Sequence, residues 1–216
     1  RGPVVSSRQF IPILSHLEFT AGTVCDNYLA LIDVDGYLWV GGLSQQIFGL
    51  SESTKSDNEA FQVSHTTKFV DIACSPGVFL AVDTDGELWG FKGENQFSRL
   101  GLGNFVAVAC GEEHQLCLDR NGDVWGAGSN QYGQLAFGQR EPVPVFAQMT
   151  KNLPIKSIAA GSYHSILLSR NGRVFACGSK NFIGEQYLES KIPAGGPYEQ
   201  IAASGNKTLV KDLKGQ

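Results

Sequence analysis

Histidine and serine side by side are the residue types in this chain that most suggest chemistry. His164 stands between Ser162 and Ser165, so a general base and a nucleophile are close in sequence. Such a pair works only when a third group orients the histidine, and closeness in sequence does not supply that geometry. None of the four histidines has a second ligand at a metal-binding spacing. We therefore expect neither catalysis nor a metal site.

The glycine-rich stretches do not match a nucleotide site. No such loop ends in Lys-Ser or Lys-Thr, as a P-loop requires. Gly126-Ala-Gly128 is followed by Gly133 at the wrong spacing for a dinucleotide fingerprint, and it lies in a predicted strand and turn rather than before a helix. No cofactor is expected.

The composition limits the class of protein. The 216 residues are 42% apolar and 18% charged and include 26 glycines, which suits short strands joined by tight turns. The formal net charge is -4 and there is no run of Lys or Arg, so direct binding to nucleic acid or to an anionic membrane is not expected. No apolar stretch reaches the roughly 18 residues that cross a bilayer, so we expect a soluble protein. The chain begins at Arg1 rather than Met, which suggests a portion of a longer protein.

The cysteines bear on the compartment. Their number is odd and no two form a C-x-x-C pair, which argues against a disulfide framework and against a zinc site. We expect buried, reduced thiols and therefore an intracellular protein, cytoplasmic or nuclear. The five are Cys25, Cys74, Cys110, Cys117 and Cys177.

A repeat organises the whole chain. An Asp-Gly or Asn-Gly pair is followed by an aromatic residue three positions after the glycine, and this occurs four times. The copies are Asp35-Gly36 with Trp39, Asp85-Gly86 with Trp89, Asn121-Gly122 with Trp125, and Asn171-Gly172 with Phe175. The glycines are spaced by 50, 36 and 50 residues. Periods of this length indicate a solenoid, a propeller or an array.

The clearest unit covers residues 106–128. Apolar residues alternate from Val106 to Cys110 and again at Leu116 and Leu118, as in β-strands. Asn121-Gly122 predicts a two-residue hairpin turn of type I′, which needs positive φ at both positions. The unit is therefore expected to run strand, short loop, strand, turn, strand.

A fourth, outer strand is expected after these three. Pro142 and Pro144 fit only an edge strand, because each removes a donor from the sheet. In the second unit, Leu100 runs almost directly into Phe105, which leaves little or no room for an outer strand.

Four-stranded units at this period predict an all-β fold, a β-propeller, with an open solenoid of hairpins as the weaker alternative. The aromatic residues that follow the turns are expected to fill the core between units. We expect a single domain, 1–216. Its units are expected at about residues 19–69, 70–105, 106–154 and 155–197, with a partial unit at 198–216.

Two units carry a joint pattern that resembles the repeat of the regulator of chromosome condensation (RCC1) family. The third unit has Gly111-x-x-His114, Asn121-Gly122, Trp125-Gly126-x-Gly128-x-Asn130 and Gly133-Gln134-Leu135. The fourth has Gly161-x-x-His164, Asn171-Gly172 and Cys177-Gly178-Ser179. In the first, second and fifth units the histidine slot holds Tyr28, Val78 and Lys207 instead.

The resemblance implies an RCC1-like β-propeller. Family members typically close a seven-bladed ring, whereas this chain holds about four and a half units. It is therefore expected to be part of a larger ring, or else a smaller ring in which Val4–Ile13 supplies outer strands for the last blade.

The candidate site is the first loop of each unit, between the Gly slot and the His slot. In a propeller these loops emerge on one face and surround its mouth. In family members that exchange nucleotide on the Ran GTPase, acidic and His side chains here engage the GTPase, so the resemblance nominates Asp26, Glu112 and Glu113. The alternative is that these acidic side chains are simply solvated and bind no partner. The predicted partner-binding residues are Asp26, Asn27, Glu112, Glu113, Ser162, Tyr163 and His164.

Three functions follow from these patterns. The first is a protein-interaction propeller with no catalytic chemistry, whose loops on one face bind a partner protein. The second is guanine-nucleotide exchange on a Ran-like small GTPase. The third, an enzyme acting through His114 or His164, is the least supported, because the recurrence of these histidines at one place in the repeat favours a structural role such as hydrogen-bonding the adjacent turn.

Overall fold

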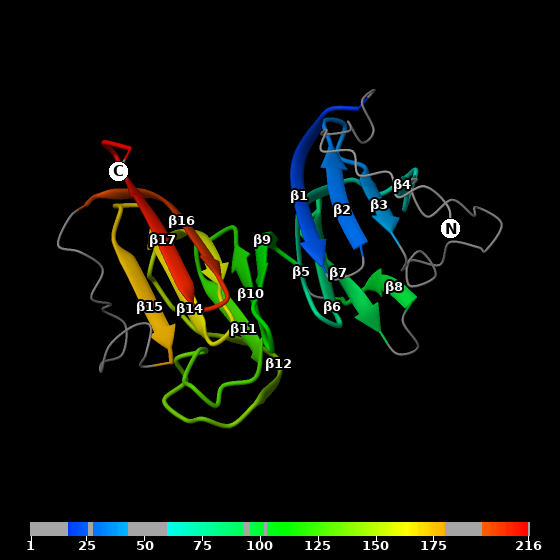
Figure 1. The fold of residues 1–216 in the computed structure, drawn as a ribbon. Helices are drawn as coiled ribbons and strands as arrows, with labels where there is room; N and C mark the ends of the chain where they lie inside the picture. The colour runs from blue at the N-terminus through cyan, green and yellow to red at the C-terminus, as the bar shows by residue number, and fades with distance from the viewer. Residues whose placement is uncertain are drawn as a thin grey trace, which may run out of the picture.

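The computed structural model describes residues 17–25, 28–42, 60–92, 96–101, 103–179 and 196–215. All regular structure in these residues is β-strand (Figure 1). No helix that could cross a bilayer occurs in this part of the chain. Val4–Ile13, considered above as a source of outer strands, lies outside the described residues.

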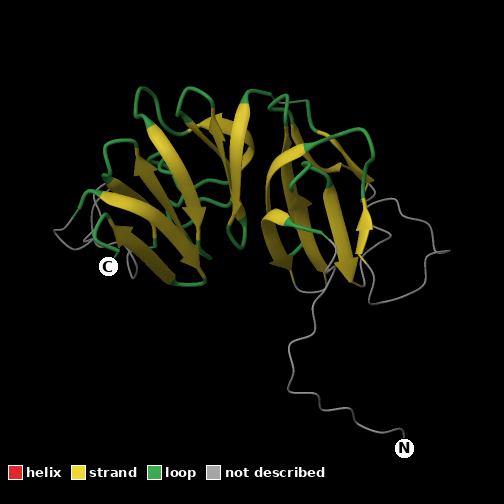
Figure 2. Ribbon diagram, turned by 90° about the horizontal axis from the view of Figure 1, so that it is seen from above, coloured by secondary structure: helices red, strands yellow, loops and turns green. Residues whose placement is uncertain are grey.

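The described strands form five antiparallel sheets that follow one another along the chain. Figure 2 shows these strands and the loops that join them. The first joins β1 (Phe19–Cys25), β2 (Tyr28–Asp33), β3 (Leu38–Gly42) and β4 (Ala60–Gln62). The second joins β5 (Phe69–Ser75), β6 (Val78–Asp83), β7 (Leu88–Lys92) and β8 (Gln96–Arg99). The third joins β9 (Phe105–Cys110), β10 (His114–Asp119), β11 (Val124–Gly128) and β12 (Val143–Gln148). The fourth contains β13 (Ile155–Ala160), β14 (His164–Ser169) and β15 (Val174–Gly178), and the fifth contains β16 (Tyr198–Ser204) and β17 (Lys207–Asp212).

The predicted all-β plan of strand, loop, strand, turn, strand is confirmed, and two details concern the outer strands. Strand β12 lies at the edge of the third sheet, as its proline predicted. The prediction of little or no room for an outer strand in the second unit is wrong, because β8 pairs with β7 along Lys92↔Gln96 to Trp89↔Arg99. Only three residues separate β7 from β8, so a short hairpin fits before the next unit begins.

The hairpin turns differ from the predicted type. Positive φ occurs at the glycine alone, with φ of 89° at Gly36 and 91° at Gly122, and not at the Asp or Asn before it. In the third unit Gly122 N donates to Asp119 O and Asp119 N donates to Asp123 O, which makes a three-residue loop with its glycine in the left-handed region. The Asp119 carboxylate favours this turn because it accepts the N–H groups of Asn121 and Asp123, each at 2.9 Å.

The same aspartate holds the aromatic residue that follows. Trp39, Trp89 and Trp125 each donate their indole N–H to the aspartate that caps their own turn, at 2.7, 2.7 and 3.3 Å. The fourth unit has Ser169 in place of the aspartate and Phe175, which has no N–H to donate, in place of the tryptophan. The three indoles are partly buried, so they serve both the core and the turn.

The hydrophobic core lies between sheets. Each of the four clusters of buried apolar residues found in the described residues draws on two successive sheets; one joins Ile32 and Leu38 to Phe69 and Phe79. The turns add a second connection, because the carbonyl of the turn glycine accepts the N–H of the first strand residue of the next unit. These hydrogen bonds are Phe69 N to Gly36 O, Phe105 N to Gly86 O, Ile155 N to Gly122 O and Tyr198 N to Gly172 O.

The prediction that all cysteines are reduced thiols is wrong for Cys74, which is disulfide-bonded. Cys110, Cys117 and Cys177 are free, and the latter two are buried. Spacing arguments fail here because the repeat brings distant residues together: Thr23 Oγ1 lies 3.2 Å from Cys74 Sγ, across the neighbouring strands β1 and β5.

Candidate functional site

Two tight loops present the predicted partner-binding residues of the third and fourth units. We call residues 111–114 and 161–164 the mouth loops. Each is closed by a hydrogen bond from the glycine N–H to the histidine carbonyl, at 2.8 Å from Gly111 to His114 and 2.9 Å from Gly161 to His164. The two residues between them are therefore held at the tip of a hairpin.

The glycines are required by the histidine rings. A side-chain carbon on Gly111 would overlap the His114 ring and the Gly161 carbonyl, and one on Gly161 would overlap the His164 ring. The loop is pinned from the other side as well, because Ser129 N donates to Glu113 O at 2.8 Å. The Gly-x-x-His pattern therefore reflects close packing, because only glycine leaves room for the histidine ring of the same loop.

Both histidines are fully buried and bond to the next unit. His114 Nε2 lies 2.9 Å from Ser165 Oγ, and His164 Nε2 lies 2.8 Å from Thr208 Oγ1. Because Ser165 Oγ donates its own proton to Gln134 O at 2.7 Å, His114 Nε2 is the donor to Ser165. The predicted structural role is thus performed toward the neighbouring unit.

Burial sets the charge of these rings. It lowers the pKa of His114 to about 4, helped by the nearby His164, and it also lowers the pKa of His164. Both are therefore neutral near pH 7. His164 was predicted to bind a partner; in the structure its side chain is 0% exposed and supports the mouth loop from below.

The residues at the loop tips are accessible. Glu112 and Glu113 are exposed, and Ser162 and Tyr163 are partly buried. Ser162 N donates to Gly205 O of the fifth unit at 2.7 Å, which fixes the fourth loop on its neighbour. Asp26 and Asn27 lie outside the described residues.

A tyrosine pair connects the two units at this face. The ring centroids of Tyr132 and Tyr163 are 4.9 Å apart with an interplanar angle of 47°, and Tyr132 is 44% exposed. Tyr132 comes from the loop after β11, where its N–H donates to Gln134 Oε1 at 3.0 Å. Sequence reasoning missed this residue, although an aromatic residue in a predicted loop is itself a signal.

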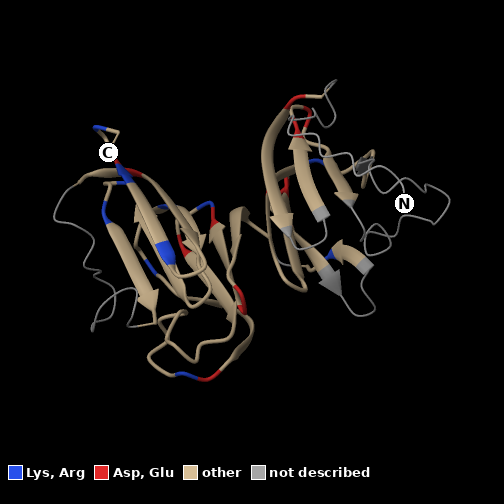
Figure 3. Cartoon of the chain, in the orientation of Figure 1, with Lys and Arg blue, Asp and Glu red and all other residues tan. Residues whose placement is uncertain are grey.

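The tyrosine pair lies close to the acids. The negative charge of Glu112 is the largest cause of a raised pKa at Tyr163, followed by burial, Tyr132, Glu113 and a hydrogen bond to Glu112. Figure 3 shows charged residues of both signs mainly in loops and at strand ends.

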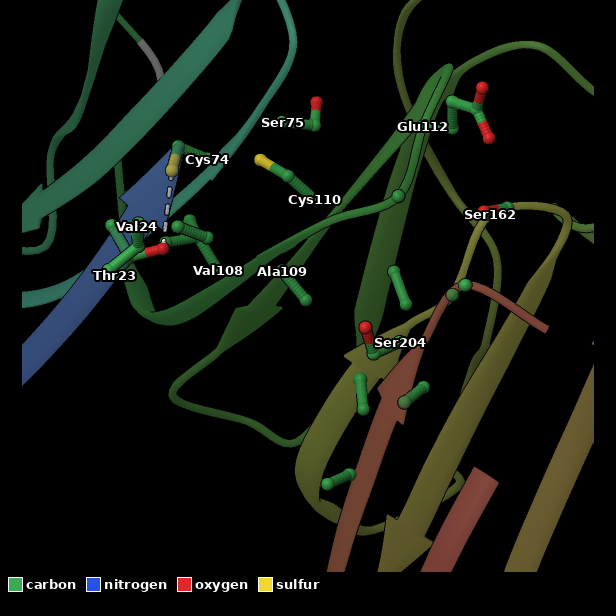
Figure 4. A pocket seen from close by; sticks show the side chains of 18 of the residues that line it. Thr23, Val24, Cys74, Ser75, Val108, Ala109, Cys110, Glu112, Ser162 and Ser204 are labelled. Carbon is green, nitrogen blue, oxygen red and sulfur yellow. Dashed lines mark hydrogen bonds between the residues drawn. The ribbon is translucent and has the colours of Figure 1, made fainter. Parts of the chain in front are cut away.

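The first strand of each sheet contributes to the lining of a hollow of about 800 Å³ (Figure 4). These strands are β1, β5, β9, β13 and β16. Its wall includes the slot twelve residues before each turn glycine, where Val24, Cys74, Cys110, Ala160 and Ala203 stand. This slot faces the hollow; Val24 is 75% exposed. Glu112 and Ser162 also belong to the lining, so the mouth loops border the hollow.

Sequence comparison identifies the repeat. The model of the regulator of chromosome condensation (RCC1) repeat matches residues 121–168, and a second model of the same repeat matches residues 105–134 and 155–182. Residues 105–182 therefore contain repeats of the RCC1 type. No curated protein matches this RCC1-repeat chain.

Solved RCC1-type propellers share the fold. Yeast RCC1 (Prp20) bound to Kap60 matches with a TM-score of 0.70 and 18% identity over 91% of this chain and 54% of that one. Prp20p from Saccharomyces cerevisiae, studied with its binding to Gsp1p and histones, matches with 0.70 and 17% over 90% and 56%. Human WBSCR16 matches with 0.69 and 16% over 87% and 57%. The chain thus matches part of an RCC1 β-propeller and spans little more than half the length of these structures.

Proposed function

We propose that this RCC1-repeat chain is a protein-interaction module that binds a partner protein through its mouth loops and has no catalytic chemistry of its own. The observation that carries the proposal is the grouping of Glu112, Glu113 and the tyrosine pair on one face across two units. Tyrosine is enriched in protein interfaces, and the loops beneath it are rigid. Protein binding by the similar yeast propeller, in complex with Kap60, supports the same class of function.

The buried polar groups support a non-catalytic role. The Ser165 hydroxyl donates to a backbone carbonyl, and both histidine rings are held in the core. A nucleophile must be accessible to its substrate, and Ser165 is fully buried. Among the described residues no group of three His, Cys, Asp or Glu could hold a metal ion.

Site-specific photo-crosslinking tests the proposal. A crosslinking amino acid replaces Glu113 in the third mouth loop, and in a control variant it replaces Asp85 in a hairpin turn of the second unit. We expect discrete crosslinks to a protein from position 113 in cells and few from position 85. Equal crosslinking from both positions, or crosslinks from position 85 alone, would refute the mouth loops as the binding surface.

Guanine-nucleotide exchange on a Ran-like GTPase is the second candidate. It is favoured by the pair Glu112-Glu113 at the mouth and by the binding of the similar Prp20p to Gsp1p. The assay follows release of a fluorescent guanine nucleotide from Ran-like GTPases after addition of the chain. Faster release that is lost with Glu112→Ala and Glu113→Ala would support exchange, and an unchanged rate would exclude it for the GTPases used.

A further inference from the structure

The border of the hollow offers a polar group that nothing in the described residues satisfies. Ser75 stands in the second unit at the slot that Gly111 and Gly161 occupy in the next two. Ser75 is 7% exposed and lines the hollow, and its side-chain hydroxyl has no hydrogen-bond partner in the described residues. Glu112 belongs to the same lining (Figure 4). A buried donor and acceptor without a partner indicates a place where a ligand group or water is accommodated.

The charged side chains that the two mouth loops themselves carry are acidic. Residues 111–114, 129–135 and 161–164 include Glu112 and Glu113 but no Lys or Arg. Arg140, five residues after the second of these segments, donates from its guanidinium to Gln131 O at 3.4 Å, so this cation lies beside the loop that carries Tyr132. The two carboxylates lie close to the exposed ring of Tyr132 and the partly buried ring of Tyr163, and they form no ion pair among the described residues.

Carboxylates beside stacked aromatic rings favour a cationic side chain. A guanidinium or ammonium group is attracted to the face of a tyrosine ring, and Arg can stack on that ring while it pairs with a carboxylate. We propose that the partner protein engages the mouth loops with a basic segment, placing an Arg or Lys side chain against the tyrosine pair beside Glu112 and Glu113. The inference rests on the proposed function, because it names the chemistry of the partner at the same loops.

Labelled probe peptides test this inference on the chain itself. Fluorescence anisotropy compares short peptides that alternate Gly with Arg, with Lys or with Glu. We expect the Arg peptide to bind about 2- to 5-fold more tightly than the Lys peptide and the Glu peptide not to bind. The affinity should fall as salt rises toward about 0.15 M, because exposed charges are screened.

Matched variants decide whether the acids carry the binding. The double variant Glu112→Gln and Glu113→Gln should weaken the Arg peptide roughly five- to ten-fold. The control Asp85→Asn removes one exposed carboxylate from a hairpin turn and should leave binding unchanged; Asn121 and Asn171 stand at its position in the third and fourth units. Tyr163→Leu should remove the preference for Arg over Lys, and Tyr163→Phe should keep it. Circular dichroism confirms that each variant is folded.

Two outcomes would overturn the inference: equal binding of the Arg and Glu peptides, or the same affinity for the Arg peptide in the double variant and in Asp85→Asn. If position 113 still crosslinks to a partner in that case, the mouth loops bind a protein but not through a basic segment. If position 113 gives no crosslinks, the proposed function itself fails.

Discussion

The third and fourth units are each joined to the next unit by a buried histidine in addition to apolar packing, whereas the first and second are joined by aromatic and aliphatic packing without a histidine. His114 and His164 each bond a hydroxyl in the next unit. In the second unit the rings of Phe69, Phe79 and Phe97 pack together, and this cluster meets Ile32 of the first. Both kinds of contact hold two successive sheets together.

The opposite ends of the units show no such variation. At the hairpin turns, the glycine carbonyl bonds the next unit in each of the four described junctions. The comparison teaches that the turn end of the repeat is the constant scaffold. The loop end varies in chemistry, and it is the loop end that carries the proposed interface.

The largest effect should come from adding a methyl group under a histidine ring. Gly111→Ala forces apart the His114 ring and the Gly161 carbonyl, so we expect a loss of about 3 kcal/mol or more in the free energy of unfolding. Gly77→Ala, in the second unit's loop, meets no atom within 4 Å and carries only the strain of a φ of 76°, about 1 kcal/mol. Urea denaturation measures both, and similar losses would mean that the two loop ends are built alike.

Removing the histidine itself should cost nearly as much. His114→Ala deletes a fully buried ring and leaves Ser165 Oγ without its donor, a loss of about 3 kcal/mol. Val78→Ala at the same slot of the second unit removes a partly exposed side chain and should cost about 1 kcal/mol. Equal destabilisation in thermal or urea melts would contradict a special role for the histidine.

The stability should depend on pH through the histidine junction. The pKa of His114 falls from 6.5 to about 4 on folding, so between these values the unfolded chain binds a proton that the folded chain does not. The free energy of unfolding should therefore drop by about 3 kcal/mol in all as the pH falls from well above 6.5 to below 4, and this group should have no effect well above pH 6.5. Denaturation at several pH values measures the slope. His114→Ala should reduce the slope and leave the part that comes from His164, whereas replacing the exposed His65 by Gln should change it less.

The smallest effect concerns the aspartate and tryptophan that the fourth unit lacks. Ser169→Asp and Phe175→Trp should each destabilise alone, because each leaves a buried polar group without its partner. Together they recreate the bond seen between Asp83 and Trp89, so a double-mutant cycle should give a favourable coupling of about 1 kcal/mol. A coupling near zero would show that the indole hydrogen bond adds nothing to the turn.

The sequence predicted the features that depend on local pattern. Alternation identified the strands of the third and fourth sheets, and the turn glycines marked the hairpins. The turn type was missed because it is set by Asp119, whose carboxylate accepts the backbone N–H groups of Asn121 and Asp123. Strand β8 was missed because four residues are too few to show alternation.

The site was only partly predictable because its contacts cross from one unit to the next. Glu112 and Glu113 lie at a loop tip, as the repeat position indicated. His164 is hydrogen-bonded to Thr208, and the ring of Tyr163 contacts that of Tyr132. Neither neighbour is marked by spacing along the chain, since each belongs to another unit.

Because every described hydrophobic cluster is assembled from two successive sheets, no single repeat is a folding unit by itself. Cutting the chain at a boundary between repeats would strip one face from each of the sheets on either side. A truncated fragment would therefore expose apolar surface at its cut end and tend to aggregate, and shorter versions designed for biophysical work would need a polar capping repeat there.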